Sequence, residues 1–353
     1  MIKKLTIAIP TYNRKEAITS KINEISSYII NHSLSEQIEL LIVDNCSSEY
    51  NIYEILENEK DTSFINVQKN IGNIGAGANF LRCLELANSE YVWLLGDDEI
   101  LDLSYLENLV TTLQDKDCYL LPHNDSYAQK ATYFGNFLSI DELFDNFWNL
   151  GSFFVLSIFI FRKDSVLNYL KEGYESVVYQ HPYSAMALSM LRDGKNIQLI
   201  NLPLLKVQTS AYSNPRFDMV NAYIDVVSTV KPFCTNKQFQ KYLKNDFYPA
   251  REKTVFEINI GLTKKINIEK TIENYKRLIS LVPAFSKIHI KSIIWINLVQ
   301  VRKLNYLISL IIYTLSKIKK NNFSKKSLND IYIYIFQYFK RKNSQTLRFQ
   351  YVK

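Results

Sequence analysis

Short apolar runs alternate with helix-like segments through roughly the first 200 residues of the chain. The runs are short, contain β-branched or aromatic side chains and are bounded by polar residues, as buried strands are. We therefore predict six strands, at residues 5–9, 38–43, 64–68, 91–95, 118–122 and 156–161.

Segments with helical patterns lie between these runs, at residues 14–30, 50–58, 76–87, 104–114 and 163–170. Ser104 and Glu107 have the S-x-x-E spacing of a capping box, which predicts a helix start at Ser104. Alternating strands and helices predict an α/β fold, with a mostly parallel sheet flanked by helices.

The pattern changes near residue 212. Pro215 and the Ser and Asn residues around it mark a loop, and helical stretches then follow without strand patterns. We predict two domains, an α/β domain at residues 1–212 and a helical, basic region at residues 213–353.

The basic charge is concentrated at the C-terminal end. Residues 285–353 contain 14 Lys and Arg and one acidic residue, Asp330, in a chain of net charge +7. Apolar residues between Leu304 and Leu315 recur at helical spacing beside lysines, and residues 331–342 repeat the theme. These features predict attachment to an anionic membrane surface, with packing on a protein as the alternative. No recognised module indicates nucleic-acid binding.

The four cysteines, Cys46, Cys83, Cys118 and Cys234, have neither CxxC nor zinc spacing, which favours a reducing compartment. The N-terminus lacks the pattern of a secretory signal, and no run approaches the ~20 apolar residues of a membrane span. We expect a cytoplasmic protein, peripheral on the inner face of the membrane.

Polar side chains follow three of the predicted strands: the run from Pro10 to Arg14, then Asp44 with Asn45, then the run from Gly96 to Glu99. Ligands of parallel α/β sheets bind beyond the carboxyl ends of the strands, so these residues should line one edge. Three consecutive carboxylates repel one another unless a cation lies on them.

The carboxylate of Asp98, with Asp97 or Glu99, offers hard oxygen ligands to Mg²⁺ or Mn²⁺. Asp44 could accept hydrogen bonds from a base or ribose, and Tyr12 could stack on a base. Taken singly, each has a plainer reading: a solvated acidic turn, an Asx turn at Asp44 and a packed ring at Tyr12. Their joint position at successive strand ends favours a metal–nucleotide site.

The stretches "IAIPTYNRKEAI", "LLIVDNCSS" and "NIGNIGAGANFLRCLELANSEYVWLLGDDE" resemble, in order and spacing, the signatures of glycosyltransferase family 2, with its glycosyltransferase A fold. The resemblance implies an inverting transfer from a nucleotide-activated sugar, with a UDP-sugar as the expected donor and Mn²⁺ or Mg²⁺ as the cofactor. The residues that match its donor-binding positions are Pro10, Thr11, Tyr12, Glu16, Asp44, Asn70, Gly72 and Asn79.

Two positions depart from the family pattern. Gly96 takes the first place of the usual D-x-D-D segment, which favours Asp98 as the metal ligand with Asp97 beside the ribose or diphosphate; a one-residue shift would pair Asp97 with Glu99. The acidic pair that commonly supplies the catalytic base is replaced by Gln180 and His181.

A histidine suits proton abstraction because its unperturbed pKa lies near 6.5. His181 is therefore the first candidate base, although capping or packing is its plainer role, and the other candidates are Glu175 and Asp125. Ser152 and Arg162 lie in a stretch that resembles the acceptor wall of the family, so both could contact acceptor, with a structural role at a strand end as the alternative.

The sequence therefore predicts an enzyme that moves a sugar onto a hydroxyl of a glycan or lipid-linked acceptor, in synthesis of a bacterial surface polysaccharide. One alternative is a metal-dependent nucleotidyltransferase, although "PTYNRKEA" lacks the glycine-rich loop expected there. The other is a non-catalytic sugar- or nucleotide-binding protein on a decayed transferase fold.

Overall fold

The computed structural model of the chain describes residues 2–56, 63–123, 133–147, 150–206 and 219–247, together with residues 277, 280 and 281. The chain forms two compact units, Met1–Pro249 and Ala250–Lys353. The elements below all belong to the first unit. The basic segments between residues 285 and 353 lie outside the described residues.

An eight-stranded sheet forms the centre of the first unit, in the order β3-β2-β1-β4-β8-β6-β9-β7. Neighbours among the first four strands pair in parallel, β8 runs antiparallel to both β4 and β6, and β7 runs antiparallel to β9. The strands are β1 (Leu5–Thr11), β2 (Ile38–Asp44), β3 (Ile65–Lys69), β4 (Tyr91–Leu94), β6 (Cys118–Leu120), β7 (Asn136–Phe137), β8 (Phe159–Arg162) and β9 (Ile197–Leu199).

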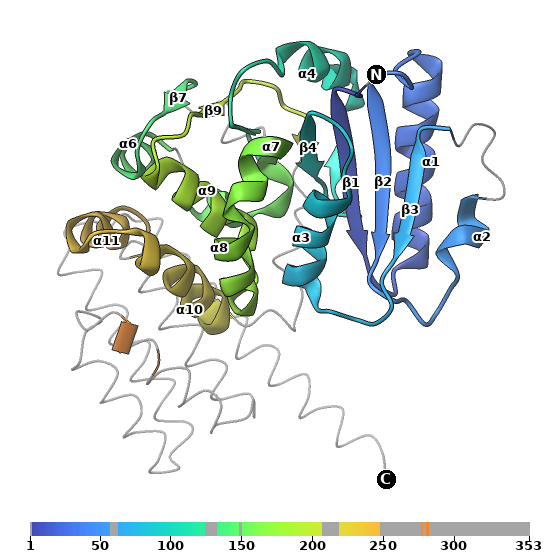
Figure 1. The fold of residues 1–353 in the computed structure, drawn as a ribbon. Coiled ribbons are helices and arrows are strands. Elements are labelled where there is room, and N and C mark those ends of the chain that lie inside the picture. Colours follow the sequence, from blue (N-terminus) through green and yellow to red (C-terminus); the bar gives the residue numbers. More distant parts are fainter. Residues whose placement is uncertain are drawn as a thin grey trace, which may run out of the picture. The chain divides into compact units, whose positions relative to one another are not determined.

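Helices α1 (Lys15–Asn31) and α3 (Ala76–Leu86) lie on opposite faces of these strands (Figure 1). The chain moves from β1 to β2 through α1 in one direction along the sheet, but from β3 back to β4 through α3 in the other, so right-handed crossovers put the two helices on different faces. The face that α1 buries carries isoleucines at helical spacing, at positions 18, 22, 25 and 29.

The other helices and 3₁₀ segments of the described residues lie around the later strands, except α2, which contacts β3. Those before β9 are α2 (Ile52–Leu56), η1 (Leu103–Tyr105), α4 (Leu106–Thr112), α6 (Ile140–Asn146), η2 (Leu150–Phe154), η3 (Leu156–Ile158), α7 (Lys163–Val166), η4 (Leu167–Tyr169), α8 (Leu170–Glu175), η5 (Val177–Tyr179) and α9 (Pro182–Arg192). Those after it are α10 (Met219–Val230), η7 (Lys231–Phe233), α11 (Asn236–Tyr242) and a π-helical turn, η8 (Leu243–Phe247). Strands β5 (Ile100–Leu101) and β10 (Leu205–Lys206) form a separate two-stranded sheet.

The sheet order creates a topological switch point between β1 and β4. The chain continues from β1 to β2 on one side, whereas β4 pairs on the other side. Ligands of open α/β sheets bind in the crevice outside the carboxyl ends of the strands at such a point. The residues after Thr11 and after Leu94 therefore meet where a ligand is expected, as the strand pattern predicts.

The predicted α/β class and the predicted strands are confirmed, with shifted ends. The run at residues 156–161 begins as a 3₁₀ turn and becomes a strand only at Phe159. Asp102, not Ser104, caps the helical segment that follows, because its carboxylate accepts hydrogen bonds from the backbone N–H (3.3 Å) and hydroxyl (2.5 Å) of Ser104. The expected capping box at Ser104 is therefore wrong.

The expected domain boundary at residue 212 falls outside the described residues, so the division into 1–212 and 213–353 stays a prediction. Helix α10 packs against α9 and η5, and α11 packs against α6, so these two helices belong to the first unit. Within the described residues, no helix combines the length and the apolarity needed to cross a bilayer.

Gly77 in α3 allows a close approach of the chain at η5. A Cβ at this position would lie 3.0 Å from the carbonyl oxygen and 3.2 Å from the Cα of Val177, whereas a Cβ at Gly72 would meet nothing within 4 Å. Because the obstacle is backbone, Gly77→Val should lower the free energy of unfolding by about 1–3 kcal/mol. Urea titration measures it, and Gly72→Val is the control, with an expected change within ~0.5 kcal/mol. Equal effects of both variants would contradict the close approach.

Candidate active site

The acidic turn after β4 is held by Arg14, the residue that precedes α1. Asp97 is 5% exposed; its Oδ2 accepts a hydrogen bond from the Thr11 hydroxyl (2.9 Å), and its Oδ1 lies 2.7 Å from Nη1 of Arg14. Asp98 is 53% exposed, and its Oδ2 lies 2.9 Å from Nη2 of Arg14. One guanidinium fork therefore bridges two adjacent carboxylates across the switch point.

Glu99 belongs to a different set of contacts. Its Oε1 accepts a hydrogen bond from the Ser157 hydroxyl (2.8 Å), and its backbone carbonyl accepts one from Nζ of Lys21 in α1 (2.6 Å). The hydroxyl of Ser157 in turn accepts a hydrogen bond from the backbone N–H of Gly96 (3.0 Å). The three consecutive acids are thus divided, two toward Arg14 and one toward Ser157.

Burial raises the pKa of Asp97, although Arg14 and the Thr11 hydroxyl oppose the shift. Burial also raises the pKa of Glu99, against the hydrogen bond from Ser157. For Arg14, burial disfavours the charged form, but the two aspartates outweigh it and raise its pKa. The turn therefore holds a permanent cation beside Asp97, a carboxylate that burial makes reluctant to ionise.

A divalent cation fits Asp97 and Asp98, because their oxygens already converge on one cationic group. Glu99 fits the same cation less well, since its carboxylate is directed to Ser157. No group of three or more His, Cys, Asp or Glu side chains suited to a metal ion occurs among the described residues. The assignment of Asp98 and Glu99 as metal ligands stays a prediction, and the geometry favours Asp97 over Glu99 as the partner of Asp98.

Gly96 fits this turn because a side chain there would be crowded. A Cβ would lie 3.2 Å from Oδ1 of Asp98 and 3.5 Å from Oγ of Ser157. A side chain at position 96 therefore requires the exposed Asp98 side chain to move by a few tenths of an ångström.

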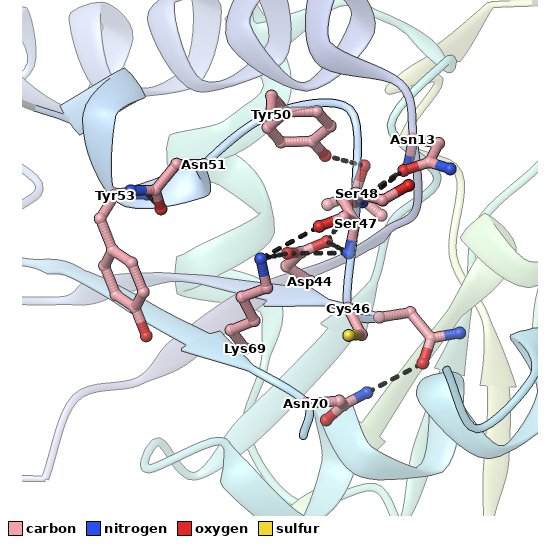
Figure 2. A network of polar contacts seen from close by, with 12 residues as sticks. Asn13, Asp44, Cys46, Ser47, Ser48, Tyr50, Asn51, Tyr53, Lys69 and Asn70 are labelled. Carbon is pink, nitrogen blue, oxygen red and sulfur yellow. Dashed lines mark hydrogen bonds and ion pairs between the residues drawn. The ribbon is translucent and has the colours of Figure 1, made fainter. Parts of the chain in front are cut away.

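Asp44, at the end of β2, is fully buried and organises the loop after it (Figure 2). Its two carboxylate oxygens accept hydrogen bonds from the backbone N–H of Ser47 (3.1 and 3.2 Å), and Oδ1 also accepts one from the Ser47 hydroxyl (2.5 Å). Nζ of Lys69 lies 3.7 Å from Oδ2. The Asx turn given above as the plainer role of Asp44 is therefore present. A contact of Asp44 with a base or ribose stays a prediction.

Four asparagines position the loop between β3 and α3. The Asn70 amide donates to the side-chain oxygens of Asn45 (3.1 Å) and Asn79 (2.8 Å), and Asn79 donates to the carbonyl of Val43 (3.1 Å). Asn45 also donates to Asn73 (2.9 Å). Asn70 and Asn79, both expected at the donor site, are thus engaged with the scaffold, where they fix the loop that would face a donor.

The other expected donor residues surround the end of β1. Pro10 and Thr11 are buried in or beside the strand, whereas Tyr12 and Glu16 are exposed. Gly72 is exposed on the asparagine-held loop. The ring of Tyr12 is therefore accessible for stacking on a base, and the roles of all five stay predictions.

His181 lies directly before α9 and contacts Phe154 and Tyr183. Its Nδ1 is 3.1 Å from the Tyr183 hydroxyl, and that hydroxyl donates its single proton to the Phe154 carbonyl (2.8 Å). Nδ1 must then carry the imidazole proton, which leaves Nε2 as the basic nitrogen. Burial lowers the pKa of His181 to about 4, against the contact with the Phe154 carbonyl.

The other base and acceptor candidates are spread more widely. Glu175 is exposed at the end of α8, and Asp125 lies outside the described residues. Ser152 is buried. Arg162 pairs with Tyr91 in the antiparallel register of β8 and β4, at the end of β4 remote from the acidic turn. This position favours the strand-end alternative, and a contact of Arg162 with acceptor stays a prediction.

Sequence reasoning gave no role to Arg14, Lys21 or Ser157. Arg14 and Lys21 are seven residues apart, so two helical turns place both on one face of α1. That spacing was available from the sequence. The position of Ser157 was not, because it depends on the pairing of β8 with β4.

Comparison with known proteins identifies the family of the N-terminal region. Residues 6–170 match the family model of glycosyl transferase family 2. This region belongs to glycosyl transferase family 2. A family 2 domain therefore contains β1 to β4 and the acidic turn.

A relative, abequosyltransferase RfbV of Salmonella typhimurium (strain LT2), is 31% identical over 125 residues, which are 35% of this chain and 36% of the relative. TarS 1–349 of S. aureus is similar in structure, with a TM-score of 0.53, 13% identity and coverage of 91% of this chain and 93% of TarS. Its complex with UDP-GlcNAc gives a TM-score of 0.55 at the same identity and coverage. At this identity the likeness shows the fold, which is the glycosyltransferase A fold of the family 2 domain.

The lowered pKa of His181 makes stability depend on pH. Between about pH 6.5 and pH 4 the unfolded histidine binds a proton that the folded one excludes, so stability should fall as the pH is lowered through this window. Urea unfolding at several pH values measures the slope, and His181→Gln should flatten it. Parallel profiles for the two proteins would show that His181 is not buried in its neutral form.

Proposed function

We propose that the chain is a metal-dependent, inverting glycosyltransferase that moves a sugar from a nucleoside-diphosphate-sugar to a hydroxyl of a glycan or lipid-linked acceptor. The observation that carries this proposal is the convergence of Asp97 and Asp98 on one cationic group at the switch point, beside the exposed ring of Tyr12. The cation site would neutralise the diphosphate of the donor, and the ring of Tyr12 would provide a surface on which its base stacks.

The comparisons support the class of donor and the biological setting. RfbV is an abequosyltransferase, so the relative itself is a sugar transferase. TarS has been solved with UDP-GlcNAc, and a chain of this fold thus accommodates a nucleotide-sugar. We extend both points to this chain, with surface polysaccharide synthesis as the setting and a UDP-sugar as the first donor to test.

In this proposal the chain's own residues bind, orient and accept a proton. Asp98 and Asp97 hold Mn²⁺ or Mg²⁺, which would supply Lewis-acid stabilisation of charge on the departing nucleoside diphosphate. Tyr12 stacks on the base, and the loop organised by Asp44 faces the nucleoside. The acceptor hydroxyl attacks the anomeric carbon and gives its proton to a base, for which Nε2 of His181 is the first candidate and Glu175 and Asp125 are the others.

Two rival functions make different demands on the same site. A nucleotidyltransferase would release pyrophosphate from a nucleoside triphosphate, whereas a glycosyltransferase releases a nucleoside diphosphate. A non-catalytic binding protein would bind the nucleotide-sugar but not consume it. Incubation of the chain with UDP-, GDP-, CDP- and dTDP-sugars, and separately with nucleoside triphosphates and a sugar phosphate, each with and without Mn²⁺, separates the three. The glycosyltransferase releases nucleoside diphosphate in the first assay, the nucleotidyltransferase releases pyrophosphate in the second, and the binding protein forms neither product.

Asp98→Asn should keep the fold and lose metal-dependent binding of nucleoside diphosphate by at least ~10-fold, because one charged ligand of the cation is removed. Calorimetric titration of UDP with and without Mn²⁺ measures this. Asp115→Asn is the control, since Asp115 is 73% exposed and contacts the adjacent Lys116. Wild-type affinity in Asp98→Asn would remove Asp98 from the metal site.

The basic C-terminal region motivates a second prediction, since a lipid-linked acceptor lies at a membrane. Each Lys near an anionic surface contributes ~1 kcal/mol, so changing three should weaken vesicle binding by roughly 100-fold. Co-sedimentation with anionic vesicles compares the wild type with the triple Gln variant of Lys317, Lys319 and Lys320. The matched control is the triple Gln variant of Lys116, Lys171 and Lys237. Equal losses in both variants would indicate attraction by net charge alone and contradict a membrane-binding segment.

A further inference from the structure

We propose that Arg14 is a displaceable counter-ion of the active site: it competes with the divalent cation for Asp97 and Asp98, and it binds the donor diphosphate once released. The inference rests on the proposed function and adds a residue to it. Three observations carry it, namely the bridging contact, the position of Arg14 on α1 and the charge balance of the turn.

The bridging contact occupies the oxygens that a cation needs. Nη1 of Arg14 lies 2.7 Å from Oδ1 of Asp97, and Nη2 lies 2.9 Å from Oδ2 of Asp98. A divalent cation on the same two carboxylates would lie close to the guanidinium, and two positive groups repel each other. Binding of the cation to Asp97 and Asp98 therefore disfavours their contact with Arg14.

The position of Arg14 is unfavourable for α1 itself. Arg14 is the N-cap of the helix, where it makes no side-chain cap and where Ser, Thr, Asp or Asn is preferred. A positive charge at a helix N-terminus also opposes the helix dipole, by typically 0.3–1 kcal/mol. Such a local conflict is expected where a residue serves a site. The side chain is 46% exposed, so it has room to move into the crevice.

The charge balance explains why the two ligands should bind together. Asp97 and Asp98 carry two negative charges, and Arg14 neutralises one of them. If only the divalent cation bound, Arg14 would lose its contacts with Asp97 and Asp98. If only the diphosphate bound, its negative charge would be repelled by the two aspartates. When both bind, the cation takes the carboxylates and Arg14 takes phosphate oxygens, which its planar fork suits.

Removal of Arg14 should therefore change the two affinities in opposite directions. Arg14→Ala should bind Mn²⁺ alone about 3- to 5-fold more tightly, the scale of one partly exposed ion pair. With Mn²⁺ saturating, it should bind UDP at least ~10-fold more weakly, the loss expected for charge-assisted hydrogen bonds. Arg14→Lys keeps the charge but not the fork, and should fall between wild type and Arg14→Ala in both measurements.

Electron paramagnetic resonance of free Mn²⁺ and calorimetry of UDP provide the two readouts, with thermal unfolding to establish that each variant is folded. Arg192→Ala is the control, because Arg192 is 45% exposed, lies 3.1 Å from Asp193 and is at the end of α9. It should match the wild type in both arms. If Arg14→Ala failed to fold, Arg14→Lys would test the same opposite changes.

Two results would overturn the inference. Unchanged or weaker Mn²⁺ binding by Arg14→Ala would show that Arg14 does not compete for the aspartates. Unchanged UDP binding would show that Arg14 does not hold the diphosphate. A wild-type chain that binds none of UDP, GDP, CDP and dTDP would instead contradict the proposed function, and the Mn²⁺ arm would still judge the competition.

Discussion

The site depends on one constraint: Asp97 is buried at the end of a central strand and needs a cation and a hydroxyl beside it. Burial raises the pKa of Asp97, and Arg14 and Thr11 oppose that shift. Both partners come from the end of β1, on the other side of the switch point. The contact that stabilises the carboxylate therefore also ties together the two strand ends at the switch point, where ligands of open α/β sheets bind.

The same constraint divides the acidic run into parts with different tasks. Asp97 and Asp98 face Arg14, whereas Glu99 faces Ser157 and its carbonyl faces Lys21. Three adjacent carboxylates that all faced the same binding site would repel one another and resist ionisation. Directing the third carboxylate backward leaves two aspartates for a cation, and it fixes the turn against α1 and η3.

The sequence predicts the sheet well where strands are long and buried on both faces. The runs at β1, β2 and β4 are mostly apolar, and all their residues are buried. Strands β5, β7 and β10, of two residues each, carry no periodicity and cannot be found this way. Their existence depends on tertiary pairing.

The sequence predicts which residues of the candidate site lie at the ends of neighbouring strands, but not which side chains they contact. The carboxylates at positions 44, 97 and 98 follow from pattern and topology, but their partners do not. Asp44 accepts hydrogen bonds from the backbone N–H and hydroxyl of Ser47, in a local turn that the sequence permits but does not require. The sequence leaves the two readings of Arg162 open because it does not show the direction of β8, and an antiparallel strand brings its end to the opposite edge.

The histidine in place of an acidic base has a physical explanation in its surroundings. His181 is buried against Phe154 and Tyr183, and the nearby Glu99 carboxylate contributes to raising the pKa of Tyr183. A carboxylate at position 181 would lose hydration there, so it would tend to be protonated and unable to accept a proton. A neutral imidazole keeps a basic nitrogen in the same place without a buried charge. The cost is basicity, since the burial that makes histidine suitable also lowers its pKa to about 4. A base of this kind can act only late, on an acceptor hydroxyl whose proton has become acidic as its bond to the anomeric carbon forms.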